Sequence, residues 1–134
     1  MPLKLEIVTP EARIYSEDVD FVTLPGVEGD MGIYPRHIPL MTQLRAGEVV
    51  ARKGGQDFFL AVGDGFVEVT GDRVAVLTDM AIRSENIDEQ KVEEARSRAE
   101  ARLKEKLSND EQAMVSASLA HSLAQLHVKR RTRR

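Results

Sequence analysis

The chain of 134 residues contains no cysteine. Disulfide bonds, thiolate nucleophiles and zinc sites built on cysteine are therefore excluded, and cysteine usage says nothing about the redox compartment. No apolar run approaches the ~20 residues that span a bilayer. The opening residues, MPLKLEIVTP, also lack a basic region followed by an apolar one. We therefore expect a soluble, cytoplasmic protein that meets a membrane only through a partner.

Aromatic residues make up only 4% of the chain, too few for a base-stacking surface, so nucleic acid is a weak candidate partner. Charge is uneven: residues 1–83 carry 8 basic and 13 acidic side chains, whereas residues 84–134 carry 11 and 9. Positive charge gathers at the end of the chain, which indicates either a solvated tail or a contact with an acidic partner. Its members are Lys129, Arg130, Arg131, Arg133 and Arg134.

The length fits one domain of ~100 residues with an appendage. Between residues 3 and 78, short apolar alternations are separated by turn residues, which is typical of an antiparallel all-β domain. Gly54-Gly55 and Gly71-Asp72 each sit between two such runs and predict two-residue hairpin turns. We therefore predict a sandwich or flattened barrel. Its expected core residues are Phe58, Leu60, Val62, Phe66, Val74, Val76 and Leu77.

After Met80 glycine is absent and the apolar period changes to about 3.6 residues, which indicates helices. Asn86 with Glu89 resembles a capping box, so we predict a first helix from Ile87. The triplet at residues 108–110 ends that helix and caps a second one that runs to about residue 128. The expected inward positions are Val92, Ala95, Ala99, Leu103 and Leu107, then Ala113, Ala117, Ala120, Leu123, Ala124 and Leu126.

The predicted fold class is therefore α+β: an N-terminal antiparallel β-sandwich over residues 1–83, followed by a C-terminal α-helical hairpin over residues 84–134. The apolar stripes of the hairpin are largely alanine and bury little area. Helices of this length are marginal alone in water, so two conformations within a few kcal/mol of each other are expected. The hairpin is either a stabilising appendage or an element that opens and binds elsewhere.

Glycine and proline are dense between residues 25 and 40, PGVEGDMGIYPRHIPL. Gly26, Gly29 and Gly32 permit positive φ or close approach of another chain, while Pro35 and Pro39 fix φ. This composition predicts a surface loop of fixed shape.

The same segment contains the pattern GxxGIxPxHxPL, and it is accompanied by VTP at residues 8–10 and GDGFVEV at residues 63–69. These motifs resemble the epsilon subunit of F-type ATP synthases, which is homologous to the delta subunit of the mitochondrial enzyme. The resemblance extends over essentially the whole chain. It implies a non-catalytic rotor subunit between the gamma subunit and the ring of c subunits, peripheral on the cytoplasmic face of the membrane. It also implies a mobile C-terminal hairpin that inhibits ATP hydrolysis.

The resemblance implies contact residues for each partner. The c ring is expected to meet Glu28, Gly29, Asp30 and Met31. The gamma subunit is expected to face Tyr34, His37, Leu40, Met41 and Thr42. The alpha and beta subunits are expected to be reached through the hairpin, with the five basic C-terminal residues as an inhibitory tail.

Some members of the family bind ATP on the hairpin through the pattern I/L-D-x-x-R-A, which falls on residues 87–92. Here Asp88 matches, but Lys91 replaces arginine and Val92 replaces alanine, and Ile82 stands where the family has a glutamate. Lysine cannot supply the bidentate fork of arginine, so ATP is expected to bind weakly or not at all. Arg98 is kept as a candidate phosphate contact, and no cofactor is expected.

The remaining polar residues do not predict an enzyme. His37, His121 and His127 are scattered, no carboxylate pair has an apolar context, and no GxxxxGK[ST] loop is present. We expect His37 to brace its segment, and His121 and His127 to lie on the polar face of the second helix. Two other interpretations stay open: a β-sandwich adaptor with a helical interaction tail, and a nucleotide-sensing regulator.

Overall fold

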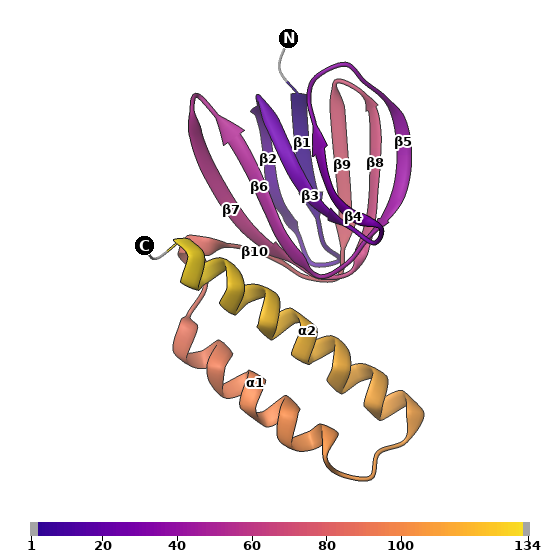
Figure 1. Cartoon of the computed structure of the whole chain (residues 1–134), viewed down its shortest axis with the longest axis vertical. Coiled ribbons are helices and arrows are strands. Elements are labelled where there is room, and N and C mark those ends of the chain that lie inside the picture. The colour runs from indigo at the N-terminus through magenta and orange to yellow at the C-terminus, as the bar shows by residue number, and fades with distance from the viewer. Residues whose placement is uncertain (1–2, 133–134) are drawn as a thin grey trace.

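The computed structural model describes residues 3–132, in which a ten-stranded sandwich stands over a pair of helices (Figure 1). The strands are β1 (Leu3–Val8), β2 (Arg13–Val19), β3 (Phe21–Gly26), β4 (Gly29–Ile33), β5 (His37–Leu44), β6 (Gly47–Lys53), β7 (Gln56–Val62), β8 (Gly65–Gly71), β9 (Arg73–Thr78) and β10 (Ala81–Arg83). The helical part consists of the short 3-10 helix η1 (Ser84–Asn86), α1 (Glu89–Leu103) and α2 (Asn109–Thr132).

The strands form one continuous sheet in the order β10-β7-β6-β3-β5-β8-β9-β1-β2, with β4 added to β3. The sheet folds back on itself so that β2 approaches β6 and β10, which gives a sandwich close to a closed barrel. The predicted α+β class, a β-sandwich followed by a helical hairpin, is confirmed. The antiparallel prediction fails at one pair, because β1 runs parallel to β9 in the register Leu5 to Val74.

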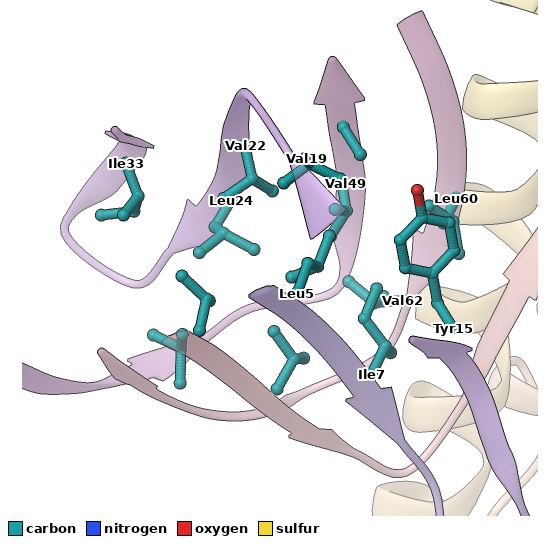
Figure 2. Packing of buried hydrophobic residues seen from close by; sticks show 14 of the residues in the cluster. Leu5, Ile7, Tyr15, Val19, Val22, Leu24, Ile33, Val49, Leu60 and Val62 are labelled. Atoms are coloured by element: carbon teal, nitrogen blue, oxygen red, sulfur yellow. The ribbon is translucent and has the colours of Figure 1, made fainter. Parts of the chain in front are cut away.

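The core lies between the two layers of the sandwich, where side chains of several strands meet (Figure 2). Of the predicted core, Leu60, Val62, Val74 and Val76 are buried. The prediction is wrong for three residues, because Phe58, Phe66 and Leu77 are 37%, 51% and 56% exposed. Phe66 and Leu77 alternate with the buried Val67 and Val76, so the pleat turns them outward. Phe58 lies near the start of β7, close to the Gly54-Gly55 turn.

The prediction of a loop at residues 25–40 is wrong. Most of this segment forms the hairpin of β3 and β4 and the start of β5. β3 ends at Gly26, β4 begins at Gly29, and Gly26 pairs with Gly29 across a two-residue turn. Of the three glycines only Gly29 has a positive φ, 134°. Gly32 serves close approach instead, since a Cβ there would lie 2.8 Å from Cζ of Phe21. The two predicted hairpin turns are confirmed, with positive φ at both residues of Gly54-Gly55 and at Gly71.

The first helix begins two residues later than predicted, because Asp88 rather than Asn86 is its N-cap. Oδ1 of Asp88 accepts a hydrogen bond from N–H of Lys91 at 3.2 Å, while Asn86 ends η1. The second helix is capped as predicted, since N–H of Glu111 donates to Oγ of Ser108 and N–H of Ser108 donates to the Glu111 carboxylate. It ends at Thr132, four residues beyond the predicted end.

α2 lies between the sandwich and α1 (Figure 1). It packs against β6, β7 and η1, and its other side packs against α1. The predicted inward positions of the first helix are all half-buried or buried. The predicted end of this helix at residues 108–110 is wrong, because α1 ends at Leu103 with Lys104 as its C-cap, and Leu107 lies in the connection to α2. In α2 the prediction is wrong for Ala113 and Leu123, which are exposed, because the contact with the sandwich shifts the buried side of the helix. The buried residues of α2 are Ser122, Ala124, Leu126 and Val128.

Candidate functional site

Three apolar side chains stand on the outer face of neighbouring strands. Met41 of β5, Phe66 of β8 and Leu77 of β9 are 66%, 51% and 56% exposed. Phe66 is directly opposite Leu77 in the antiparallel register, and Leu77 is opposite Val8 of the parallel strand β1. We call Met41, Phe66 and Leu77 the outer apolar face. Adjacent exposed apolar side chains of this kind mark interaction surfaces.

The outer apolar face continues toward the turn between β3 and β4. Val27, in that turn, is 48% exposed, and its N–H donates to the carbonyl of Gln43 at 3.1 Å. A groove of about 470 Å³ is lined by Val27, Phe66 and neighbouring residues of β5. The surface therefore offers both a flat apolar part and a shallow depression. The sequence signal that predicts it is an apolar residue at an outward position of a strand, as at Phe66 before Val67.

The residues expected to meet the c ring lie at the tip of the β3–β4 hairpin. Glu28, Gly29 and Asp30 are exposed, whereas Met31 is half-buried against the sandwich core. Oδ1 of Asp30 accepts a hydrogen bond from Nη2 of Arg45 at 2.8 Å, so this carboxylate already has a basic partner within the chain. The tip is polar and held in shape by an ion pair.

The structure divides the residues expected to face gamma. Met41 belongs to the outer apolar face, but the half-buried Leu40 and Thr42 lie opposite Val69 and Val67, on the other side of β5. Tyr34 is 65% exposed and stacks on Phe21, with ring centroids 4.3 Å apart.

His37 lies where the register between β5 and β8 shifts, and its Nδ1 is 2.7 Å from the carbonyl of Ile38. This contact braces the irregular start of β5. Ile38, at the same irregularity, is 76% exposed, and the sequence does not predict it as a site residue.

The three residues expected to bind a nucleotide do not form a site together in the described structure. The Asp88 carboxylate caps α1. The side chains of Lys91 and Arg98 are exposed, and within residues 3–132 neither forms a hydrogen bond or an ion pair. Ile82, at the position where the family has a glutamate, packs in the apolar cluster beneath the helices.

The basic end of α2 makes several contacts within the chain. Nζ of Lys129 donates to the carbonyl of Ser84 at 3.1 Å, Nη2 of Arg130 to Glu93 at 2.7 Å and Nη1 of Arg131 to Glu48 at 2.5 Å. The hydrogen bond from Arg96, aided by the one from Arg130, holds the pKa of Glu93 below its usual range. Arg133 and Arg134 lie outside the described residues. The basic residues that are described extend the helix rather than forming a tail beyond it.

In the described part of the chain, no metal centre accompanies these surfaces. No group of three or more His, Asp or Glu residues lies together there in a way that would hold a metal ion. Nε2 of His121 is 3.1 Å from Oδ1 of Asp79, which links α2 to the segment between β9 and β10. His127 is exposed on α2. Between residues 3 and 132, no helix combines the length and apolar character needed to cross a membrane.

The two parts of the chain match known families. Residues 2–84 match the model described as ATP synthase, Delta/Epsilon chain, beta-sandwich domain, and residues 85–130 match the long alpha-helix domain of the same chain. The ATP synthase epsilon chain of Dehalococcoides mccartyi is 46% identical over 133 residues, which cover 98% of this chain and 95% of that one. The epsilon chain of Herpetosiphon aurantiacus is 42% identical over 128 residues, covering 96% and 94%.

Solved structures show the same fold. A chain of the Euglena gracilis mitochondrial ATP synthase matches with a TM-score of 0.77 and 23% identity, covering 94% of this chain and 79% of that one. A chain from the central stalk and c ring of the Tetrahymena thermophila enzyme matches with a TM-score of 0.58 and 12% identity, covering 98% and 96%. Together with the sequence matches over nearly its full length, this similarity shows that the chain belongs to the ATP synthase delta/epsilon family.

Proposed function

We propose that this chain is the non-catalytic epsilon subunit in the central stalk of an F-type ATP synthase, where it couples the gamma subunit to the c ring. The relatives that match over nearly their whole length are epsilon chains. Residues 1–83 act as the rotor-stalk domain and residues 84–134 as a regulatory hairpin that inhibits ATP hydrolysis. The subunit meets the membrane only through the complex, on its cytoplasmic face.

The outer apolar face is the feature that supports the proposed contact with gamma. Stable interfaces have an apolar centre and a polar rim, and here Met41, Phe66 and Leu77 are bordered by Gln43 and Glu68 on the same side of the sheet. We assign this face to gamma because a stalk subunit keeps that partner permanently. The exposed Tyr34 and the braced segment at His37 extend the same contact.

The tip of the β3–β4 hairpin suits the c ring better. Its exposed Glu28 and Asp30 are charged, and Val27 is the one large apolar side chain among residues 27–30, which is less than the apolar centre of a permanent interface. Polar loops of the ring are compatible partners for such a tip, and Gly29 fixes its turn with a positive φ. The proposed division is therefore an apolar face for gamma and a polar tip for the ring.

The gamma contact is tested by placing a charge on the outer apolar face. Phe66→Asp should abolish co-elution with gamma in size-exclusion chromatography after co-expression. Met114→Asp is the matched control, because Met114 is 74% exposed on α2, away from the sheet. Co-elution of Phe66→Asp with gamma at the wild-type level would overturn the assignment, provided that both variants melt as the wild type does.

The proposed inhibitory contact is made by the basic end of α2 with acidic surfaces of the alpha and beta subunits. Exposed ion pairs contribute only about 0.2–1 kcal/mol each, so several must act together and salt must weaken them. Hydrolysis by the assembled head should be inhibited less by a chain ending at Val128 than by the full chain, and the difference should shrink at high ionic strength. Equal inhibition by both chains at both salt concentrations would contradict an electrostatic tail.

A further inference from the structure

Glu48 of β6 lies beneath the last turn of α2, and its side chain is only 10% exposed. Oε1 accepts a hydrogen bond from Nη1 of Arg131 at 2.5 Å. Oε2 is buried and has no hydrogen-bond partner in the described structure. Burying a carboxylate oxygen without a hydrogen-bond partner costs free energy, so it destabilises the docked position of α2 in which this oxygen is buried. Glu48 therefore depends on one cation, and that cation is supplied by the helix that covers it.

The groups around Glu48 come from three other elements. Arg131 and His127 belong to α2, Asp30 belongs to β4, and the ring of Phe59 on β7 lies 5.4 Å from the Arg131 guanidinium. Burial raises the pKa of Glu48 and Asp30 adds to the rise, whereas Arg131 and His127 lower it without cancelling the effect of burial. Arg45, Arg52 and Asp57 line the same groove of about 650 Å³ between α2 and the sandwich.

Other contacts hold α2 in place without this penalty. Ala124 and Val128 pack with Ala61 of β7, Nζ of Lys129 donates to the carbonyl of Ser84, and His121 meets Asp79. These contacts stabilise the docked helix, because each one joins α2 to another part of the chain through apolar packing or a hydrogen bond. Glu48 is the contact in which docking removes water from a charge and leaves one oxygen unsatisfied.

We propose that Glu48 is a release element: its buried carboxylate opposes the docking of α2 on the sandwich, and Arg131 makes docking possible by neutralising it. When α2 leaves, Glu48 is hydrated and the basic end of the helix is freed. Removal of Arg131 alone therefore loosens the helix, whereas removal of the Glu48 charge tightens it. This inference concerns the isolated chain and holds whatever partners the chain has.

The buried Glu48 carboxylate also makes the docking of α2 depend on pH. Because its pKa is raised in the docked state relative to a hydrated carboxylate, the docked state binds a proton on Glu48 more tightly than the released state. Docking should therefore strengthen as pH falls through that raised pKa and weaken as pH rises through it. His127 and the His121–Asp79 pair also lie where α2 meets the rest of the chain, so the contribution of Glu48 is measured as the part that Glu48→Gln abolishes.

The chain has no cysteine, which allows clean spin labelling at two introduced sites. Gln56→Cys on β7 and Ser118→Cys on α2 are both exposed, and the distance distribution between their labels reports the docked fraction. Arg131→Met should lower the ratio of docked to released chains by about tenfold, since a charge left without its partner is costly. Glu48→Gln added to Arg131→Met should restore docking to at least the wild-type ratio.

The matched control is Glu17→Gln, which breaks a surface ion pair with Lys53 and should leave the distribution unchanged. An ordinary attractive ion pair predicts a different pattern, in which Glu48→Gln loosens the helix as much as Arg131→Met and the double variant recovers nothing. That pattern would overturn the proposal, and so would an Arg131→Met variant that docks as the wild type does. Far-ultraviolet circular dichroism checks that each variant keeps its helices.

Discussion

The sandwich and the helical hairpin bury different kinds of side chain. The sandwich interior consists mainly of fully buried aliphatic residues, such as Leu5, Leu24 and Leu60. By contrast, Ala99 is the one buried residue of α1, and α2 adds four, of which only Leu126 is large. Burial contributes about 25 cal/mol per Å² of apolar surface. The sandwich therefore carries its own core, whereas the hairpin depends on contacts with β6 and β7.

This difference links the sandwich to the stability of the fold and the hairpin to regulation. A β domain with a dense core keeps the shape of its docking surfaces at all times, while a lightly packed hairpin can change position for a few kcal/mol. Several polar contacts of α2, such as those of Arg130 with Glu93 and of His121 with Asp79, are partly exposed to solvent, whereas the Glu48 side chain is largely buried. Several substitutions test how far the two regions differ.

The largest effect is expected from leucine-to-alanine changes placed in each region. Leu24→Ala should lower the free energy of unfolding by about 2–5 kcal/mol, because it opens a cavity in a close-packed core. Leu126→Ala should leave the main urea transition nearly unchanged and accelerate amide exchange in α1 and α2. Urea unfolding and hydrogen exchange measure the two outcomes. Leu77→Ala, on the outer apolar face, is the control, and equal loss of stability in all three variants would erase the distinction.

A smaller effect is expected where the sandwich depends on shape rather than charge. Gly32→Val should cost about 1–3 kcal/mol, because the new side chain displaces the ring of Phe21 and its stack with Tyr34. Asp30→Ala should cost at most about 1 kcal/mol, because its ion pair with Arg45 is exposed. Chemical denaturation separates the two. A larger loss for Asp30→Ala would mean that charge shapes this hairpin.

Within the helical region, the cap of α2 should have a measurable but local effect. Ser108→Ala should destabilise the helix start by about 1 kcal/mol, because N–H of Glu111 loses its acceptor. The hydrogen bonds from Ser108 lower the pKa of Glu111, so the stabilisation is present above the ordinary carboxylate pKa and is lost as pH falls through the lowered value. Helicity followed against pH should show this step in the wild type and lose it in Glu111→Gln.

The smallest effect is expected from ATP. A ligand that bound the hairpin would stabilise it and raise its melting temperature, by an amount that grows with ligand concentration. We expect no shift at millimolar ATP, because Asp88 caps α1 and the lysine at position 91 lacks the arginine fork. The double variant Lys91→Arg and Val92→Ala serves as the comparison. A clear shift in the wild type would show that the hairpin has a ligand-dependent source of stability.

The sequence predicts the fold class well because alternation and glycine pairs are local signals. The turns at Gly54-Gly55 and Gly71 follow from backbone preference alone, and so does the switch to helices after β10. The misplaced helix start has an equally local cause. Both Asn86 and Asp88 are suitable caps, and only the backbone after η1 decides between them.

The candidate site is predicted less well because it depends on the register between strands. Hydrophobicity predicts Phe66 and Leu77 in the core, although alternation with Val67 and Val76 places them outside. Their adjacency on the surface follows from the pairing of β8 with β9, which no single strand reveals. The contact between Glu48 and Arg131 joins residues 83 positions apart and has no signal in the sequence.

The parallel pairing of β1 with β9 has a consequence for biosynthesis. Leu5 pairs with Val74, so the sheet closes only when the ribosome has delivered residues about 70 positions downstream of the first strand. Contacts of such long sequence separation form slowly, because a large loop must be ordered first. Both helices follow this point in the chain and therefore emerge later, after the strands that receive them have been synthesised. The order of translation thus delivers the platform before the regulatory element that docks on it.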